Sequence, residues 1–103
     1  LKQLSQLSQI LLDITKKIPN DIPWVIQIQG HTDPRPIKTL RYPSNWELST
    51  ARAISVAQVF MESGLSSKKI SVAGFAEFQP LTKGLDEASY RRNRRIEIKL
   101  TQP

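Results

Sequence analysis

Residues 30–52 read GHTDPRPIKTLRYPSNWELSTAR, and this stretch decides how the chain folds. Its first part contains three prolines, Pro34, Pro36 and Pro43. Because proline fixes φ and lacks a backbone donor, these residues predict a loop rather than a helix or a central strand. Ser44, with Glu47 three residues later, forms the S-x-x-E capping box that starts a helix. The stretch predicts a stiff loop between a strand and a capped helix, which can position a binding site. On spacing alone, an ordinary connection with solvated charges is an equal alternative.

The helix that starts after Ser44 has a regular apolar face. Apolar residues recur along it at i, i+3, i+4 and i+7: Ala53, Val56, Ala57 and Phe60. Gly64 is positioned as the C-terminal cap. The two alanines indicate that this face approaches a sheet closely.

Three segments have the composition or the alternation of strands: 24–29 (WVIQIQ), 69–73 (KISVA) and 95–100 (RIEIKL). Gly30 and Gly74 are expected to end the first two. The third alternates, which predicts Ile96, Ile98 and Leu100 facing inward, with Glu97 and Lys99 facing outward.

Two further helices complete the pattern. Residues 1–18 predict an amphipathic helix with an apolar face made of Leu4, Leu7, Leu11, Ile14 and Ile18. Packing on a sheet is the favoured interpretation, and a short coiled-coil seam is the alternative. Residues 85–92 predict a short helix with Asp86 and Glu87 near its N-terminus. The order α-β-α-β-α-β predicts one α/β domain over residues 1–103, a two-layer α+β sandwich with helices on one mixed sheet.

Composition excludes several classes of site. The chain has 103 residues, enough for one domain with a modest core. It contains no cysteine and one histidine, so we expect no disulfide, no metal site and no cofactor. No apolar run approaches the roughly 20 residues that span a bilayer, and no signal peptide is present. Since the chain begins with Leu1, we expect it to be a piece of a longer protein whose remainder would carry any membrane anchor.

The net charge of +6 predicts an anionic partner. Four arginines gather around Asn93, in the sequence RRNRR: Arg91, Arg92, Arg94 and Arg95. A nucleic-acid-binding domain that uses this cluster is the alternative function. It is disfavoured because the basic residues do not form a stripe interleaved with aromatic residues.

The spacing of polar residues indicates a ligand site beside the proline loop. Asn45, Ser49 and Arg52 fall on one stripe of the capped helix. The side chain of Arg52 leans toward the helix N-terminus and can approach the loop that holds Asp33. The two residues either pair with each other, or stand apart as receptors for the carboxylate and the ammonium of an amino-acid-like head group.

A catalytic interpretation is weaker. His31, Asp33 and a serine, Ser44 or Ser49, would make a triad on paper, but no nucleophile elbow is present. We expect no enzyme and no catalytic residues, with His31 in a structural role. Trp46 is expected to cover the loop or to anchor the core.

Four motifs, GHTD at 30–33, SNWELSTARA at 44–53, GFAEFQP at 74–80 and NRRIEI at 93–98, resemble the OmpA-like peptidoglycan-binding domain. The resemblance covers about residues 22–100. Within that family, the long proline loop and the RYPSNWELS segment are most similar to MotB, the stator proteins of flagellar motors.

The resemblance implies noncovalent binding of the diaminopimelate of the peptidoglycan stem peptide. It implies that Asp33 contacts the amino-acid head group and that Arg52 takes its carboxylate. The resemblance also places Asn45 and Arg94 in the pocket, with Thr32 and Leu48 at its flanks. Asn93 is expected to fix the start of the last strand.

The resemblance further implies a periplasmic, wall-associated domain that anchors a membrane-attached protein. Peptidoglycan is the expected partner, no nucleic acid is expected, the membrane would be reached only through other segments, and stator relatives pair, which leaves a homodimer open. The sequence departs from the family in having no strand before the first helix and in its DEASYRR segment. The inserted loop, Pro34 to Pro43, could cover the pocket.

Overall fold

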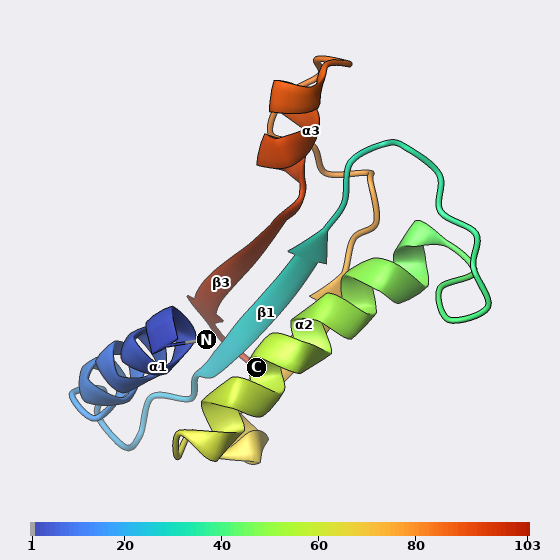
Figure 1. The fold of residues 1–103 in the computed structure, drawn as a ribbon. Coiled ribbons are helices and arrows are strands. Elements are labelled where there is room, and N and C mark those ends of the chain that lie inside the picture. The colour runs from blue at the N-terminus through green and yellow to red at the C-terminus, as the bar shows by residue number, and fades with distance from the viewer. Residues whose placement is uncertain (1) are drawn as a thin grey trace.

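A computed structural model describes residues 2–103 of the chain (Figure 1). Its elements are α1 (Lys2–Thr15), β1 (Val25–His31), α2 (Asn45–Glu62), a short 3-10 helix η1 (Ser67–Lys69), β2 (Ile70–Gly74), α3 (Glu87–Asn93) and β3 (Arg95–Thr101). The predicted order of helices and strands is confirmed. None of the helices in residues 2–103 combines the length and the apolar composition needed to cross a bilayer.

The sheet has the strand order β2-β1-β3. β1 pairs in parallel with β2, from Ile26 opposite Ile70 to Gly30 opposite Gly74. It pairs antiparallel with β3 as far as His31 opposite Arg95. Gly74 is the last residue of β2, as predicted, whereas β1 continues one residue beyond Gly30 to His31, which corrects the prediction for Gly30. The parallel β1 and β2 end at the same edge of the sheet, where the loops that follow them meet.

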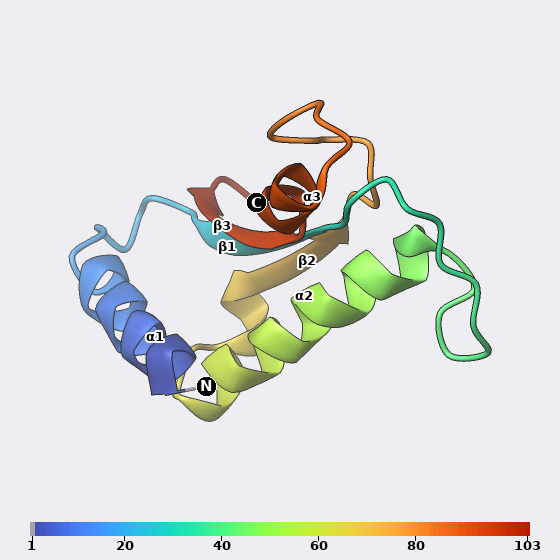
Figure 2. The same ribbon diagram turned by 45° about the horizontal axis from the view of Figure 1, so that its top comes forward.

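The core lies between the sheet and α2 (Figure 2). Ile26 and Ile28 of β1 are fully buried against one face of α2. All four apolar residues predicted for that face are buried: Ala53, Val56, Ala57 and Phe60. Ser44 caps α2, since its Oγ accepts a hydrogen bond from the backbone nitrogen of Trp46 (3.1 Å) and contacts the Glu47 carboxylate. The predicted cap and core face are confirmed.

α1 lies on the same side of the sheet as α2 (Figure 2). Four of its leucines pack against the core: Leu4, Leu7, Leu11 and Leu12. The helix ends at Thr15, not at residue 18, because the next two backbone bonds span only three residues and tighten the chain before Pro19. Ile14, predicted on the packed face, is exposed.

α3 stands beyond the end of the sheet rather than upon it (Figure 1). It begins at Glu87, two residues later than predicted, because Asp86 caps it: Asp86 Oδ1 accepts from Ser89 N at 3.0 Å. The prediction that Leu100 faces inward was wrong, since its side chain is 48% exposed near the end of the edge strand β3. α3 therefore lies beside the loop that follows β1, where its Glu87 contacts Arg35.

Candidate ligand-binding site

The six residues predicted to form the binding site line one cavity of about 220 Å³: Thr32, Asp33, Asn45, Leu48, Arg52 and Arg94. They come from the residues after β1, from the first turns of α2 and from the junction of α3 with β3. The proline loop adds Arg35, Pro36 and Ile37 to the lining. The fold therefore gathers residues that are up to 62 positions apart in the chain, and their role in binding stays a prediction.

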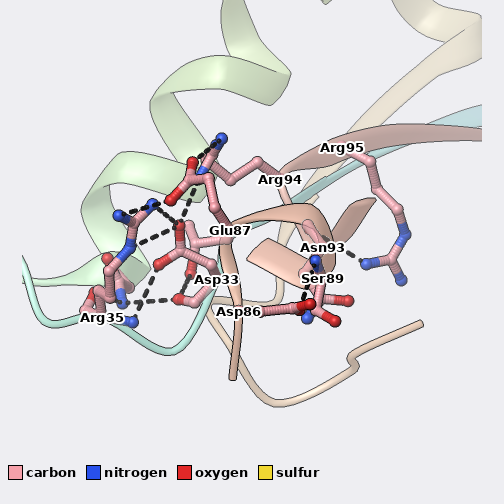
Figure 3. Close-up of polar contacts among 10 residues, drawn as sticks. Asp33, Arg35, Asp86, Glu87, Ser89, Asn93, Arg94 and Arg95 are labelled. Carbon is pink, nitrogen blue, oxygen red and sulfur yellow. Dashed lines mark hydrogen bonds and ion pairs between the residues drawn. The ribbon is translucent and has the colours of Figure 1, made fainter. Parts of the chain in front are cut away.

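Asp33 is the most engaged residue of this cavity (Figure 3). Its Oδ2 accepts from Arg35 Nη2 (2.7 Å), from Arg35 Nε (3.2 Å) and from Arg94 Nη1 (2.8 Å). Its Oδ1 accepts from the backbone nitrogen of Arg35 at 2.9 Å. The guanidinium of Arg35, followed by that of Arg94, lowers the pKa of Asp33 to about 2 although burial opposes this. The carboxylate is therefore ionised at neutral pH.

Arg52 does not pair with Asp33. Among residues 2–103, no carboxylate lies within ion-pair distance of its guanidinium. Of the two arrangements that the spacing left open, the residues stand apart, and Asp33 pairs with Arg35 and Arg94 instead. The cavity therefore holds one paired carboxylate and one guanidinium that is available to an anionic group.

Asn45 holds the proline loop against the start of α2. Its side chain is buried, and Nδ2 donates to the carbonyl oxygens of Arg35 (3.1 Å) and Asp33 (3.5 Å). Ser49, predicted on one polar stripe with Asn45 and Arg52, does not line the cavity with them. Ser49 is fully buried, and its Oγ accepts from Ala76 N (3.1 Å) and donates to a backbone carbonyl of its own helix.

The α3 side of the site contains two residues that sequence reasoning missed. Glu87 bridges the two arginines on Asp33, at 3.4 Å from Arg35 Nη1 and 3.3 Å from Arg94 Nη2 (Figure 3). The guanidinium carbon of Arg35 lies 4.6 Å from the ring centroid of Tyr90. Arg35 itself had a signal in the sequence, because it lies two positions after Asp33, whereas Glu87 and Tyr90 lie more than fifty positions away.

Asn93 fixes the loop before α3 rather than the start of β3, which corrects its predicted role. Its Oδ1 accepts from the backbone nitrogens of Leu81 (2.9 Å) and Thr82 (3.2 Å), and its Nδ2 donates to Thr82 O (3.0 Å). The buried side-chain amide thus supplies the hydrogen-bond partners for backbone groups of this loop, which does not pair with a strand.

The arginine cluster around Asn93 is divided by the fold. Arg94 turns to Asp33, and Arg95 pairs with Glu97 (2.6 Å) and donates to Gln79 O (2.8 Å). Arg91 and Arg92 are exposed. Half of the cluster is thus committed to internal contacts.

His31 is structural in this arrangement. It is buried, its ring stacks on Phe75 with centroids 5.1 Å apart, and its Nε2 lies 3.4 Å from Gln29 Oε1. Burial, together with the charge of Arg95, lowers the pKa of His31. The two serines considered for a catalytic triad do not contact His31. Ser44 caps α2, and the hydroxyl of Ser49 accepts a hydrogen bond from the backbone nitrogen of Ala76.

Trp46 was predicted to cover the loop or to anchor the core. It does not anchor the core, because its side chain is half-exposed and packs on Phe78 with centroids 5.3 Å apart. A second hollow places Trp46 beside Pro36 and Ile37 of the proline loop.

The lowered pKa of Asp33 predicts acid sensitivity. Its contribution to the free energy of unfolding is complete above its usual pKa of 3.8 and is lost as the pH falls through its folded value of about 2. Because the side chain of Arg35 is 49% exposed, we expect this contribution to be about 1–2 kcal/mol. Urea unfolding of wild type and Asp33→Asn at about pH 6, 4 and 2 measures it. The difference between the two proteins should shrink at the lowest pH, and a constant difference would contradict the prediction.

Comparison with known proteins identifies the family. Residues 2–94 match the OmpA family. The chain belongs to the OmpA family. Among its relatives, an uncharacterised protein of Bacillus subtilis, YtxE, is 42% identical over 99 residues, which cover 95% of this chain and 39% of YtxE. Motility protein B of the same organism is 36% identical over 77 residues, covering 74% of this chain and 30% of that protein.

A relative that is not a motility protein, and a solved structure, are also similar to this chain. The peptidoglycan-associated lipoprotein of Legionella pneumophila is 36% identical over 73 residues, covering 71% of this chain and 39% of the lipoprotein. The crystal structure of a MotB-like protein from Desulfovibrio vulgaris superposes with a TM-score of 0.80 at 26% identity, over 97% of this chain and 60% of that one. This OmpA-family chain thus spans less than half of the length of these sequence relatives, and the predicted α+β fold is confirmed.

Proposed function

We propose that this OmpA-family domain binds peptidoglycan noncovalently and without turnover, and that it does so through the diaminopimelate of the stem peptide. The observation that carries the proposal is the cavity of about 220 Å³ in which Asp33 and Arg52 stand apart. Diaminopimelate presents an ammonium and a carboxylate on one carbon atom. A carboxylate at one wall and a guanidinium at another match those two charges.

The chemistry of each contact follows from the residues. The guanidinium of Arg52 can donate two parallel hydrogen bonds to a carboxylate, and such charge-assisted, two-pronged contacts are stronger than neutral hydrogen bonds. Asp33 accepts from cationic donors, as its present contacts with Arg35 and Arg94 show. Asn45 keeps the loop in place, and Leu48 supplies an apolar wall.

The relatives support the same function at the level of the whole protein. One of them is described as a peptidoglycan-associated lipoprotein and another as motility protein B. By this reasoning the domain lies in the periplasm and anchors a larger envelope protein of the MotB type to the cell wall. Its partner is peptidoglycan rather than nucleic acid, and other segments of the protein would reach the membrane and pair two copies.

Sedimentation with purified diaminopimelate-containing peptidoglycan tests the proposal. Wild type should sediment with the wall, while Asp33→Ala and Arg52→Ala should remain in solution although circular dichroism shows them folded. Losing one half of the clamp should weaken binding by about 2–4 kcal/mol, because the other charge stays in place without its counterpart.

Arg91→Ala is the matched control, since it removes one exposed positive charge outside the cavity. It should bind the wall as wild type does. If all four proteins bind alike and high salt releases them together, the attraction is only the charge of +6 and the pocket has no part in it. If nucleic acid instead binds the wild type and Arg91→Ala weakens that binding, the arginine cluster is the functional surface.

A further inference from the structure

The guanidinium of Arg35 occupies the place where the proposed function puts the ligand's ammonium. Its Nη2 and Nε lie 2.7 Å and 3.2 Å from Asp33 Oδ2. A ligand ammonium and this guanidinium are both cations that donate to the same carboxylate. They therefore compete for Asp33.

Arg35 has other contacts that do not involve the carboxylate. Its Nη1 lies 3.4 Å from Glu87 Oε2, and its guanidinium carbon lies 4.6 Å from the centroid of the Tyr90 ring. Its side chain is 49% exposed, so that it can move without disturbing the core. When it leaves Asp33, it retains an anion and an aromatic ring on α3.

The loop does not depend on that guanidinium for its position. The backbone nitrogen of Arg35 donates to Asp33 Oδ1 at 2.9 Å, and its carbonyl oxygen accepts from Asn45 Nδ2 at 3.1 Å. Arg94 contacts the same carboxylate oxygen, at 2.8 Å. Movement of the Arg35 side chain thus opens one donor position on Asp33 while the backbone and Arg94 hold the carboxylate.

We infer that Arg35 is an internal competitor for the ammonium subsite and that it lowers the affinity of the pocket for ligands with a free ammonium. This inference rests on the proposed function. A ligand with a free ammonium replaces the guanidinium on Asp33, which then stays with Glu87 and Tyr90. A ligand with a blocked amine carries no cation that can replace Arg35 on Asp33, so its affinity does not depend on Arg35.

Calorimetric binding of a soluble diaminopimelate-containing muropeptide to Arg35→Ala tests this. Because the competing surface ion pair is gone, the variant should bind about three- to tenfold more tightly than wild type. Arg35→Lys should lie between them, since an ammonium cannot form the two-pronged contact. Arg41→Ala is the matched control: it removes the same charge from the same loop, where Arg41 lies over Tyr42 (5.4 Å) and outside the cavity. It should bind as wild type does.

A second ligand and a second readout separate the explanations. With a muropeptide acetylated at the diaminopimelate amine, the gain of Arg35→Ala should disappear. Carboxyl NMR titration should show the pKa of Asp33 rising toward its usual 3.8 in Arg35→Ala. An unchanged pKa would mean that the contact does not exist in solution, and the inference would then be wrong.

The remaining outcomes are equally decisive. Weaker binding by Arg35→Ala would mean that Arg35 itself contacts the ligand, and unchanged binding would mean that Arg35 has no effect on it. Either result overturns the inference. The proposed function still holds in both cases if Asp33→Ala and Arg52→Ala lose binding. If neither wild type nor Arg35→Ala binds the muropeptide or the wall, the proposed function fails and the inference with it.

Discussion

Gly30→Ala is expected to separate α2 from the sheet and to leave the domain largely unfolded. A Cβ at position 30 would lie 2.0 Å from the carbonyl oxygen of Ser49 and 2.8 Å from its carbonyl carbon. Both are backbone atoms of α2, so no side chain can rotate to make room. β1 is the central strand, held between β2 and β3, so it cannot retreat either. Overpacking that moves a whole helix should cost about 3 kcal/mol or more, a large part of the stability of a small domain.

Thermal and urea unfolding measure this effect, and Gly84→Ala is the control. A Cβ at Gly84 would meet the hydroxyl of Ser89 at 2.1 Å and its Cβ at 3.0 Å, but the hydroxyl can rotate away and Gly84 lies in an exposed loop that can shift by a few tenths of an ångström. We expect Gly84→Ala to lose less than about 1 kcal/mol. If Gly30→Ala unfolds at the same temperature and urea concentration as Gly84→Ala, α2 can move away from β1 at little cost in free energy, and the prediction is wrong.

Phe60→Ala is expected to remove about 3–5 kcal/mol of unfolding free energy, because it deletes a ring from the centre of the core. Phe60 is fully buried on the face of α2 that contacts the fully buried Ile26 and Ile28. The cavity left behind has walls on the sheet and on α2, and neither can collapse without breaking hydrogen bonds. The loss should therefore lie near the upper part of this range.

Urea unfolding with Ile54→Ala as the control tests this second prediction. Ile54 lies on the same helix and is exposed, so its truncation changes helix propensity but leaves no cavity. It should change stability by about 0.5 kcal/mol or less. Equal losses in the two variants would mean that the contact between α2 and the sheet is not the principal core.

Under the proposed function, Gly30→Ala and Asp33→Ala together separate a loss of folding from a loss of binding. Gly30→Ala should fail to bind peptidoglycan because the loops at the end of the sheet are no longer held together. Asp33→Ala should fail while folded. Circular dichroism on each preparation distinguishes the two causes.

Helix α2 shows how much local sequence determines. Its cap at Ser44 and its buried face depend on residues within a few positions of one another, and both were predicted correctly. Its C-cap is Ser63, one residue before the predicted Gly64, which follows with a positive φ of 111°. The end of β1 was not predicted correctly, because the strand continues through Gly30 to His31, which pairs with Arg95 of β3. Gly30 and Gly74 pair with each other across the sheet, and that pairing is not visible along the chain.

The binding site, too, was predictable from the sequence only in part. The motifs by themselves determined the family, the order of the elements and the six residues that line the cavity, because each motif places its residues at a known end of a strand or a helix. Only the tertiary structure decided which side chains pair with Asp33. That depended on bringing α3 beside the proline loop, where Glu87 and Tyr90 hold the guanidinium of Arg35 close to the carboxylate and leave Arg52 without a partner among residues 2–103. The cationic side chains near Asp33 come from the proline loop (Arg35), from α2 (Arg52) and from the junction of α3 with β3 (Arg94), and their order along the chain does not say which of them pair with Asp33.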